Sequence, residues 1–159
     1  MAGQQHHYQV RVQWQGCRDT GTTGYRDYGR EHQLSAPGKA PIEGSADPAF
    51  LGNADRWNPE ELLVGSLSAC HKLWYLHLCA EAGVVVLAYD DHVDGEMDAA
   101  LGRFTRVTLR PHITLSADSS ESLALELHER AHEKCFIANS VNFSVECQPI
   151  FSRKGTCHG

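Results

Sequence analysis

Apolar and polar residues alternate near the N-terminus. The apolar positions of this stretch are Tyr8, Val10, Val12 and Trp14. Their period of two predicts a β-strand with one buried face. A turn-rich segment, 16–24, follows, and the alternating stretch from about Tyr25 to Leu34 is expected to pair back on the first strand as a hairpin. Ser35 to Arg56, rich in proline and glycine, is expected to be a long ordered loop.

A long apolar segment in the middle of the chain carries helix start and stop signals. Asn58 is placed to cap the helix, Pro59 suits its first turn, and Glu61 follows the cap by three residues. Gly83 suits the position just past its end. The helix would contain about 24 residues and be about 36 Å long. It is too apolar to be covered on one side only, which favours a homodimer.

Strand patterns return after this helix. Val84 to Tyr89 is rich in β-branched residues, and the strand is expected to continue through Met97. After a turn at 98–103, alternation from Val107 to Leu115 predicts the partner strand of a second hairpin, with Pro111 at a bulge or an edge.

A second helix and one more strand complete the predicted fold. Asp118, with Glu121 three residues later, is expected to open a helix that runs to about Lys134. Val141 to Ile150 is expected to be the last strand. The predicted order is strand, strand, helix, strand, strand, helix, strand, in a single α+β domain covering residues 1–159.

Charge and composition narrow the classes of partner. The formal net charge is -6, and there is no cluster of lysine and arginine, so a nucleic acid is not expected as a partner. We find neither a secretory signal nor an apolar run long enough to cross a membrane, and we expect a cytoplasmic protein. Its six cysteines are then expected to be thiols, transient catalytic disulfides or metal ligands.

One stripe of the central helix carries candidate chemistry. Steps of three and four residues connect Glu60, Leu63, Leu67, Cys70 and Trp74. Cys70 could be a reactive thiol or an inert core cysteine, and Glu60 could be a partner or a first-turn carboxylate that favours the helix dipole. A reactive thiolate needs a cation nearby. Arg26 and Arg30, expected on one strand face, are candidates, although both could be solvated surface residues.

Cys135 follows the second predicted helix. The C-terminal end of a helix carries partial negative charge, which disfavours a thiolate there. If the two cysteines act together, Cys70 attacks and Cys135 resolves. We interpret Cys79 and Cys147 as core residues, and His71, which is off the stripe, as a packing residue.

These motifs resemble the OsmC/Ohr family of osmotically inducible and organic-hydroperoxide-resistance proteins. The resemblance rests on Asn58-Pro59-Glu60, on Cys70 ten residues after that glutamate, and on Ala131-His132-Glu133-Lys134-Cys135. It implies that Cys70 is the peroxidatic thiol and Cys135 the resolving thiol, and that Glu60 with Arg26 or Arg30 activates Cys70. It also implies an intertwined homodimer with long central helices packed on curved antiparallel sheets.

The predicted function is therefore a thiol-dependent peroxidase that reduces small organic hydroperoxides through a Cys70 sulfenic acid and a Cys70–Cys135 disulfide. We expect no bound cofactor; an external dithiol, for the family a lipoylated protein or a small dithiol, would reset the disulfide. The alternative is an OsmC-like redox-sensing or ligand-binding protein with little turnover. A metal site of Cys70, His71, His132 and Cys135 is disfavoured because these spacings differ from those of structural zinc sites.

Overall fold

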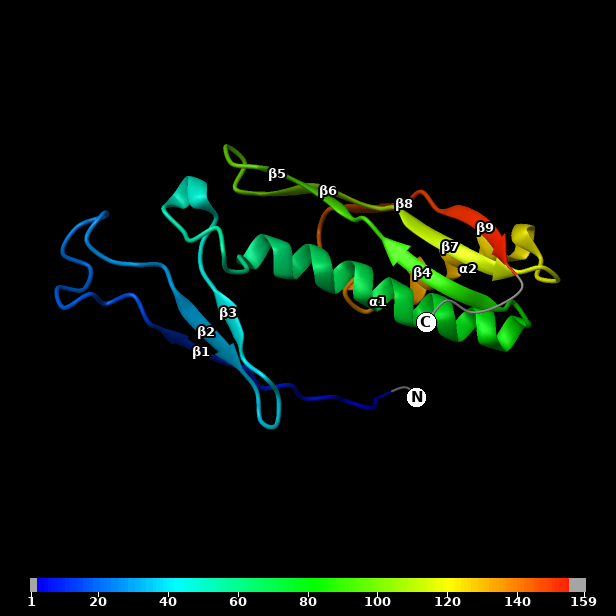
Figure 1. Cartoon of the computed structure of the whole chain (residues 1–159), viewed down its shortest axis with the longest axis horizontal. Coiled ribbons are helices and arrows are strands. Elements are labelled where there is room, and N and C mark those ends of the chain that lie inside the picture. Colours follow the sequence, from blue (N-terminus) through cyan, green and yellow to red (C-terminus); the bar gives the residue numbers. More distant parts are fainter. Residues whose placement is uncertain (1–2, 155–159) are drawn as a thin grey trace. The chain divides into compact units, whose positions relative to one another are not determined.

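The computed structural model describes residues 3–154, which fall into two compact units, Met1–Leu62 and Leu63–Gly159 (Figure 1). Each unit is described by itself. The fold is α+β, as predicted, with strands and two long helices. Within the described residues, neither helix combines the length and apolarity needed to cross a lipid bilayer.

The first unit contains a small antiparallel sheet. Strands β1 (Arg11–Trp14), β2 (His32–Ser35) and β3 (Ile42–Gly44) are hydrogen-bonded in that order, and a short 3-10 helix, η1 (Pro48–Phe50), follows. The β1–β2 pairing confirms the first hairpin, with Val12 opposite Leu34. Strand β3 was not predicted, since its three residues lie within the proposed long loop.

Two details of the first hairpin were predicted wrongly. Strand β2 begins only at His32, because the preceding residues fold into a loop closed by backbone hydrogen bonds from Gly29 N to Gly16 O and from Gln15 N to Glu31 O, both 2.8 Å. The apolar side chains of the first stretch are not buried in the single chain, where Val12 is 62% exposed. Among residues 3–62, the strands form this one three-stranded sheet, and Trp14 beside Val12 is also exposed.

Helix α1 (Pro59–Ala82) has the start and end that the sequence predicts. The Asn58 side chain accepts a hydrogen bond from Glu61 N (2.8 Å), and the Glu61 carboxylate accepts one from Asn58 N (3.1 Å). Gly83 has a positive φ of 78°, which ends the helix at little steric cost. The buried residues of α1 are Leu67, His71, Tyr75, Leu78 and Cys79.

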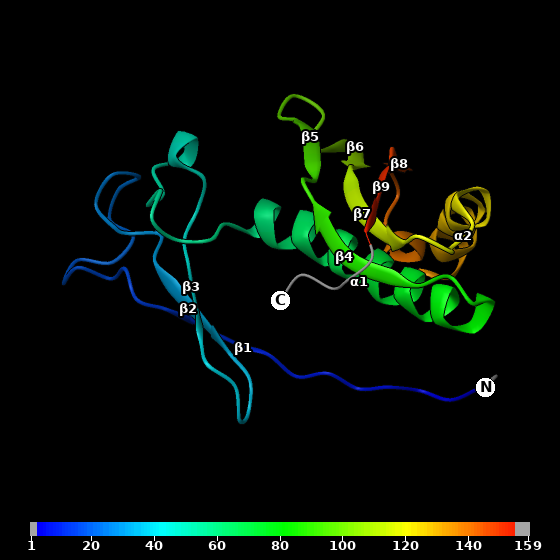
Figure 2. The ribbon, with the colours of Figure 1, turned by 45° about the vertical axis from the view of Figure 1, so that its right-hand side comes forward.

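The second hairpin exists but is split between two sheets, shown from two sides in Figures 1 and 2. Strands β4 (Val86–Asp91) and β7 (Pro111–Ser116) pair in one sheet, and β5 (Asp94–Asp98) and β6 (Arg103–Leu109) pair in the other. The expected continuous strands are therefore wrong, and each breaks into two.

Asp91 lies where the hairpin changes sheet. One of its carboxylate oxygens accepts a hydrogen bond from Arg110 N (2.7 Å), and the other accepts one from the Ser68 hydroxyl of α1 (2.6 Å). Pro111 has no N–H to offer a strand partner at this point. The break in the hairpin is therefore fixed to α1, two residues before Cys70.

The second helix, α2 (Glu121–Lys134), ends as predicted but is capped differently. Ser120 is the cap, because its hydroxyl accepts a hydrogen bond from Leu123 N (3.1 Å); Asp118 lies too early in the chain. A 3-10 turn, η2 (Ala138–Ser140), follows α2.

The predicted last strand is two strands. Strand β8 (Ser144–Cys147) pairs with β6, and β9 (Ile150–Lys154) pairs with β7. Both pairings are parallel, so the two sheets of the second unit are mixed rather than antiparallel as expected. The break falls at Gln148, whose N–H donates to Leu109 O (2.8 Å), and at Pro149, which has no N–H.

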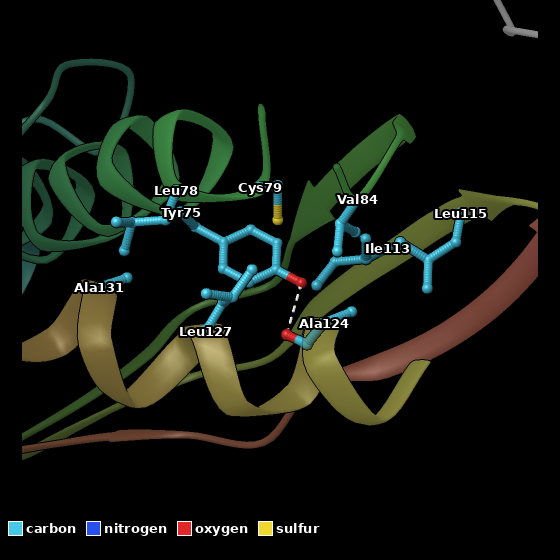
Figure 3. Close-up of a cluster of buried hydrophobic side chains, with 9 residues drawn as sticks. All are labelled: Tyr75, Leu78, Cys79, Val84, Ile113, Leu115, Ala124, Leu127 and Ala131. Atoms are coloured by element: carbon cyan, nitrogen blue, oxygen red, sulfur yellow. Dashed lines mark hydrogen bonds between the residues drawn. The ribbon is translucent and has the colours of Figure 1, made fainter. Parts of the chain in front are cut away.

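The main core of the second unit joins α1, α2 and the β4–β7–β9 sheet (Figure 3). Tyr75 of α1 lies at its centre, fully buried, and its hydroxyl donates to Ala124 O of α2 at 2.8 Å. The other buried members are Leu78, Cys79, Val84, Ile113, Leu115, Ala124, Leu127 and Ala131. This core fixes α1 against α2.

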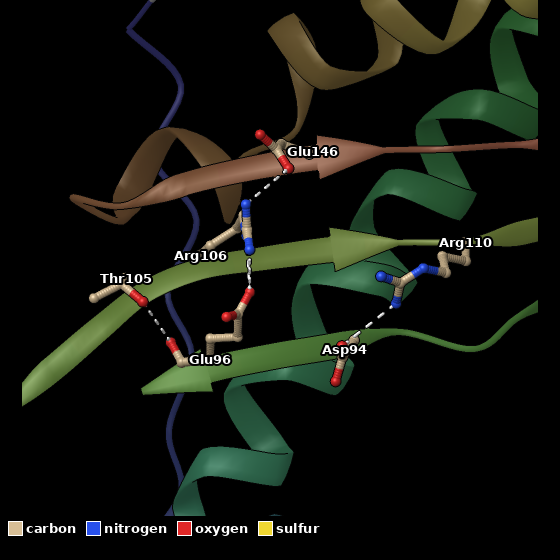
Figure 4. A network of polar contacts seen from close by, with 6 residues as sticks. All are labelled: Asp94, Glu96, Thr105, Arg106, Arg110 and Glu146. Atoms are coloured by element: carbon tan, nitrogen blue, oxygen red, sulfur yellow. Dashed lines mark hydrogen bonds and ion pairs between the residues drawn. The ribbon is translucent and has the colours of Figure 1, made fainter. Parts of the chain in front are cut away.

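The β5–β6–β8 sheet has one polar face and one apolar face. On the polar face, Arg106 pairs with Glu96 at 2.7 Å and with Glu146 at 4.0 Å (Figure 4). Exposed ion pairs of this kind add little stability. The apolar residues Val107 and Leu109 pack with Leu67 of α1, so this sheet is held mainly by its contact with the helix.

The cap of α2 gives a direct test of the revised helix start. Substitution of Ser120 by alanine removes the acceptor for Leu123 N and is expected to lower the free energy of unfolding by about 1 kcal/mol. The matched change Asp118→Ala is expected to stay within about 0.5 kcal/mol. Urea unfolding followed by circular dichroism measures both. An equal or larger loss for Asp118→Ala would restore Asp118 as the cap.

Candidate functional site: a pair of cysteines beside a buried histidine pair

Cys70 and Cys135 lie together in the second unit. Cys70 is on α1 and partly exposed, whereas Cys135 directly follows α2 and is 1% exposed. The two thiols lie near enough for Cys70 to influence the pKa of Cys135. Residues that are 65 positions apart in the chain are therefore placed for sulfur–sulfur chemistry by the packing of α1 on α2.

The surroundings of Cys135 keep its proton on the sulfur. Burial, with a smaller contribution from the Cys70 thiol, raises the pKa of Cys135 well above its ordinary value. The backbone N–H of Ala138 donates to the Cys135 sulfur at 3.4 Å, and that of Ile137 also points to it; both act in the opposite direction but do not offset the burial. Cys135 is a buried thiol, while Cys70 has access to solvent.

An aromatic pair lies next to the two cysteines. Trp74 follows Cys70 by one helical turn, and Phe136 follows Cys135 directly. Their rings meet edge to face with centroids 5.6 Å apart. Phe136 is 68% exposed, so its ring is available to an apolar molecule that approaches the thiols.

The remaining predicted site residues belong to the first unit. Arg26 and Arg30 lie in the loop before β2 rather than on a strand, so the prediction that they share a strand face is wrong. Arg30 donates to the carbonyls of Tyr28 and Tyr25, each at 2.7 Å, and its guanidinium lies over both rings. Glu60 is in the first turn of α1. The approach of these three residues to Cys70 stays a prediction.

A second cluster lies inside the second unit. His71 of α1, His128 of α2 and Cys147 at the end of β8 meet there. The two imidazoles are joined by a hydrogen bond of 2.9 Å between His71 Nε2 and His128 Nδ1. The Cys147 sulfur is 3.6 Å from His128 Nδ1 and 3.9 Å from His71 Nε2. His71 and His128 are 2% and 4% exposed, so the cluster is a polar group inside the core.

Burial sets the protonation of this cluster. It lowers the pKa of His71 to about 4 and that of His128 to about 3, and each is lowered further by a neighbouring histidine, His132 for His71 and His71 for His128. Burial, with the nearby Asp91 carboxylate, raises the pKa of Cys147 to about 12. At neutral pH both rings are uncharged and Cys147 is a thiol.

Comparison with known proteins identifies the family. Residues 52–149 match the family described as OsmC-like protein. An OsmC-like protein of unknown function from Vibrio cholerae is 30% identical, with a TM-score of 0.83, over 92% of this chain and 100% of that chain. The chain belongs to the OsmC-like family.

Two more distant relatives are also similar to this OsmC-like chain. The uncharacterised protein YmaD of Bacillus subtilis is 24% identical over 90% of this chain and 91% of its own length. An organic hydroperoxide resistance protein OsmC from Legionella pneumophila is 18% identical, with a TM-score of 0.62, over 93% of this chain and 99% of that chain. The family thus includes proteins named for hydroperoxide resistance.

The sequence reasoning found the cysteine pair of this OsmC-like protein but missed His128. A signal was present, because His128 and His132 form a His-Glu-x-x-His sequence at helical spacing. The two histidines differ in their surroundings, since His128 is buried and His132 is exposed. Cys147, interpreted as a core residue, is partly buried and faces the histidines.

The histidine pair predicts a specific dependence of stability on pH. In the unfolded chain both histidines take up a proton near pH 6.5, whereas in the folded protein they resist protonation down to about pH 4 and pH 3. The contribution of the two neutral histidines to the free energy of unfolding is therefore complete above pH 6.5 and is lost as the pH falls towards 3 to 4. Between pH 7 and pH 5 the free energy of unfolding is expected to fall by roughly 1–2 kcal/mol per histidine.

Urea unfolding at pH 7, 6 and 5 measures this loss. The exposed neighbour provides the control, because His132 makes only the smaller contribution to the lowered pKa of His71. His132→Gln should therefore change the pH dependence much less than His71→Asn combined with His128→Asn, which should flatten it. A wild-type protein equally stable at pH 7 and pH 5 would contradict the account of the buried pair.

Proposed function

We propose that this OsmC-like protein is a thiol-dependent peroxidase that reduces small organic hydroperoxides. The observation that carries the proposal is the contact between a partly exposed thiol, Cys70, and a buried thiol, Cys135. The family adds support, since several relatives with this fold are named organic hydroperoxide resistance proteins.

In the first step, the Cys70 thiolate attacks the outer oxygen of the hydroperoxide. The O–O bond breaks, the sulfur gains a hydroxyl group as a sulfenic acid, and the other oxygen takes up a proton and leaves as the alcohol. Cys135 retains its proton and contacts Cys70, so it can donate a hydrogen bond to the Cys70 thiolate before attack. The Trp74–Phe136 pair offers an apolar surface that favours an organic hydroperoxide over hydrogen peroxide.

In the second step, the Cys135 sulfur displaces the hydroxyl group from Cys70. A disulfide forms, and the proton of Cys135 leaves with the hydroxide as water. An external dithiol then reduces the disulfide by exchange, being oxidised in turn, and both thiols are restored. Burial of Cys135 protects it from direct oxidation, so the order of the two cysteines follows from their exposure.

An arginine and Glu60 complete the proposed site. The guanidinium would stabilise the Cys70 thiolate and the charge that develops on the departing oxygen, and Glu60 would accept its hydrogen bonds and orient it. Arg26 and Arg30 are both candidates. Arg30 is already bonded to two loop carbonyls, so it would have to exchange these contacts or act through the loop that it holds. The homodimer expected from α1 would supply further cover for the site.

The cysteine roles predict a characteristic pattern of turnover. With cumene hydroperoxide and a dithiol reductant, Cys70→Ser is expected to abolish peroxide consumption. Cys135→Ser is expected to keep a single oxidation of Cys70 but lose dithiol-driven cycling. Cys79→Ser is the control, because Cys79 is a buried cysteine of α1 that is not part of the pair, and this variant should retain activity. Peroxide consumption followed with time measures all three, and hydrogen peroxide is expected to be consumed more slowly by the wild type.

If the disulfide forms but no dithiol supports turnover, the protein is a redox sensor and the proposed enzyme activity is wrong. Full activity of Cys70→Ser would remove the proposed mechanism altogether.

Paired arginine variants identify the activating cation. We expect Arg26→Gln or Arg30→Gln to lower kcat/KM for the hydroperoxide by about 10²–10³-fold, the usual cost of removing a donor to a developing oxyanion, and the other to have a much smaller effect. Glu60→Gln should follow the sensitive arginine with a smaller loss. Arg110→Gln, on the exposed surface of the second unit, is the control. Unchanged kcat/KM in both variants would exclude an arginine from this segment.

A further inference from the structure

The buried cluster of His71, His128 and Cys147 has the form of a metal site. The ligand atoms His71 Nε2, His128 Nδ1 and Cys147 Sγ come from α1, α2 and β8, and they all lie within 4.8 Å of one another. The proposed peroxidase reaction uses none of them.

The dimensions of the triangle match those of a tetrahedral zinc site. With zinc–nitrogen bonds of about 2.0–2.1 Å and a zinc–sulfur bond of about 2.3 Å, two nitrogens lie about 3.3 Å apart and a nitrogen and the sulfur about 3.6 Å. The observed separations are 2.9 Å between the nitrogens, and 3.6 and 3.9 Å from the sulfur. The ion can enter only when the hydrogen bond between the rings breaks and both rings turn towards the Cys147 sulfur, because in the free protein the two nitrogens point at each other.

Packing brings the two rings and the thiol together at this point. The imidazoles of His71 and His128 are inclined by only 3° to each other. The Tyr75 ring stacks on His128 with centroids 3.8 Å apart, and its hydroxyl is fixed to Ala124 O. The Nε2 atom of His128 is buried without a hydrogen-bond partner. The core therefore gathers the three ligand atoms before any ion binds.

The site also lies beside a pocket and has a favourable charge. A pocket of about 750 Å³ is lined by His128 and Cys147, so the cluster borders this pocket. The Asp91 carboxylate lies near enough to Cys147 to interact with it electrostatically, and its negative charge favours a cation at the cluster.

We propose that His71 Nε2, His128 Nδ1 and Cys147 Sγ bind a Zn²⁺ ion whose fourth position opens to this pocket. Two nitrogens and a sulfur are ligands for zinc rather than for magnesium or calcium, which require oxygen. On binding, the Cys147 thiol gives up its proton to solvent and forms the Zn–S bond. In the free protein one of the two facing nitrogens carries the proton of the 2.9 Å hydrogen bond, so that ring moves its proton to its other nitrogen, and both imidazoles bind as neutral ligands. The site then carries a net charge of +1. No electron is transferred.

This site differs from two that the sequence suggests. The His-Glu-x-x-His segment would use His132, but that residue is exposed and is not a member of the cluster. The set of Cys70, His71, His132 and Cys135 would use both cysteines of the peroxidase pair. Any two of the three alternatives share one histidine, but they differ in the cysteine and in His132, so variants separate them.

Metal binding to the metal-stripped protein tests the proposal. The protein is treated with a chelator under reducing conditions, then titrated with Zn²⁺ by calorimetry and with Co²⁺ by absorption spectroscopy. We expect one ion per chain, a thiolate-to-cobalt charge-transfer band and the intense visible bands of a four-coordinate cobalt ion. Cys147→Ser should remove the charge-transfer band, and Cys147→Ser and His128→Gln should each weaken zinc binding by at least about 10–100-fold.

The controls are His132→Gln, Cys70→Ser and Cys135→Ser, which should all bind zinc as the wild type does. Because Cys70→Ser is expected to be inactive as a peroxidase and still to bind zinc, a failure of the zinc site and a failure of the peroxidase are distinguished. Near-ultraviolet circular dichroism of the variants checks that the core is intact, and the cobalt spectrum of the wild type shows without any variant whether a thiolate ligates the ion.

Three results would overturn the proposal: no stoichiometric binding of Zn²⁺ by the wild type, loss of binding in His132→Gln with retention in Cys147→Ser, or a cobalt spectrum without thiolate charge transfer. Binding of Cu⁺ but not Zn²⁺ would likewise reject zinc as the ion.

Discussion

The packing of α1 against α2 is the contact on which the chemistry of this protein depends. Tyr75 is buried at the centre of that contact and is hydrogen-bonded to the backbone of α2 at Ala124. Towards the start of α1 the same contact brings Cys70 to Cys135, and it also brings His71 to His128. Neither pair is close in the sequence. A change that altered the spacing of the two helices would therefore disturb the thiols and the histidines together.

Unequal burial distinguishes the two cysteines. Both are thiols next to helices, but only Cys135 is enclosed, and burial raises its pKa. Cys70 is partly exposed and lies one helical turn before Trp74 of the aromatic pair. The charge at the C-terminal end of α2 acts in the same direction as burial, since it also disfavours a thiolate at Cys135. The proposed division into an attacking and a resolving thiol thus follows from the local environment.

Much of the fold could be predicted from the sequence, because the ends of the two helices are marked by residues close to them in the chain. The cap at Asn58, the stop at Gly83 and the end of α2 at Lys134 all depend on residues next to the helix end. The break of the hairpin into two sheets could not be predicted, since it depends on the tertiary contact of Asp91 with Ser68 and Arg110. The parallel pairing of β8 with β6 and of β9 with β7 likewise depends on where the chain returns after α2.

The site could be predicted only in part, because some of its residues carry local sequence signals and others meet only through tertiary contacts. Helical spacing and the chain motifs pointed to Cys70 and Cys135, and the structure brings them together. The loop that holds Arg30 was taken for a strand, because alternation alone does not reveal a turn closed by backbone hydrogen bonds. The cluster of His71, His128 and Cys147 was missed, since it draws one residue from each of three elements.

The most direct test of the central claim is mass spectrometry of the thiols after one equivalent of an organic hydroperoxide. The protein is oxidised, unfolded in the presence of an alkylating reagent and digested. We predict a disulfide between Cys70 and Cys135, with Cys79 and Cys147 alkylated, and in Cys135→Ser an oxidised Cys70 without that disulfide. A Cys70 that remains alkylated while another cysteine is oxidised would contradict the account.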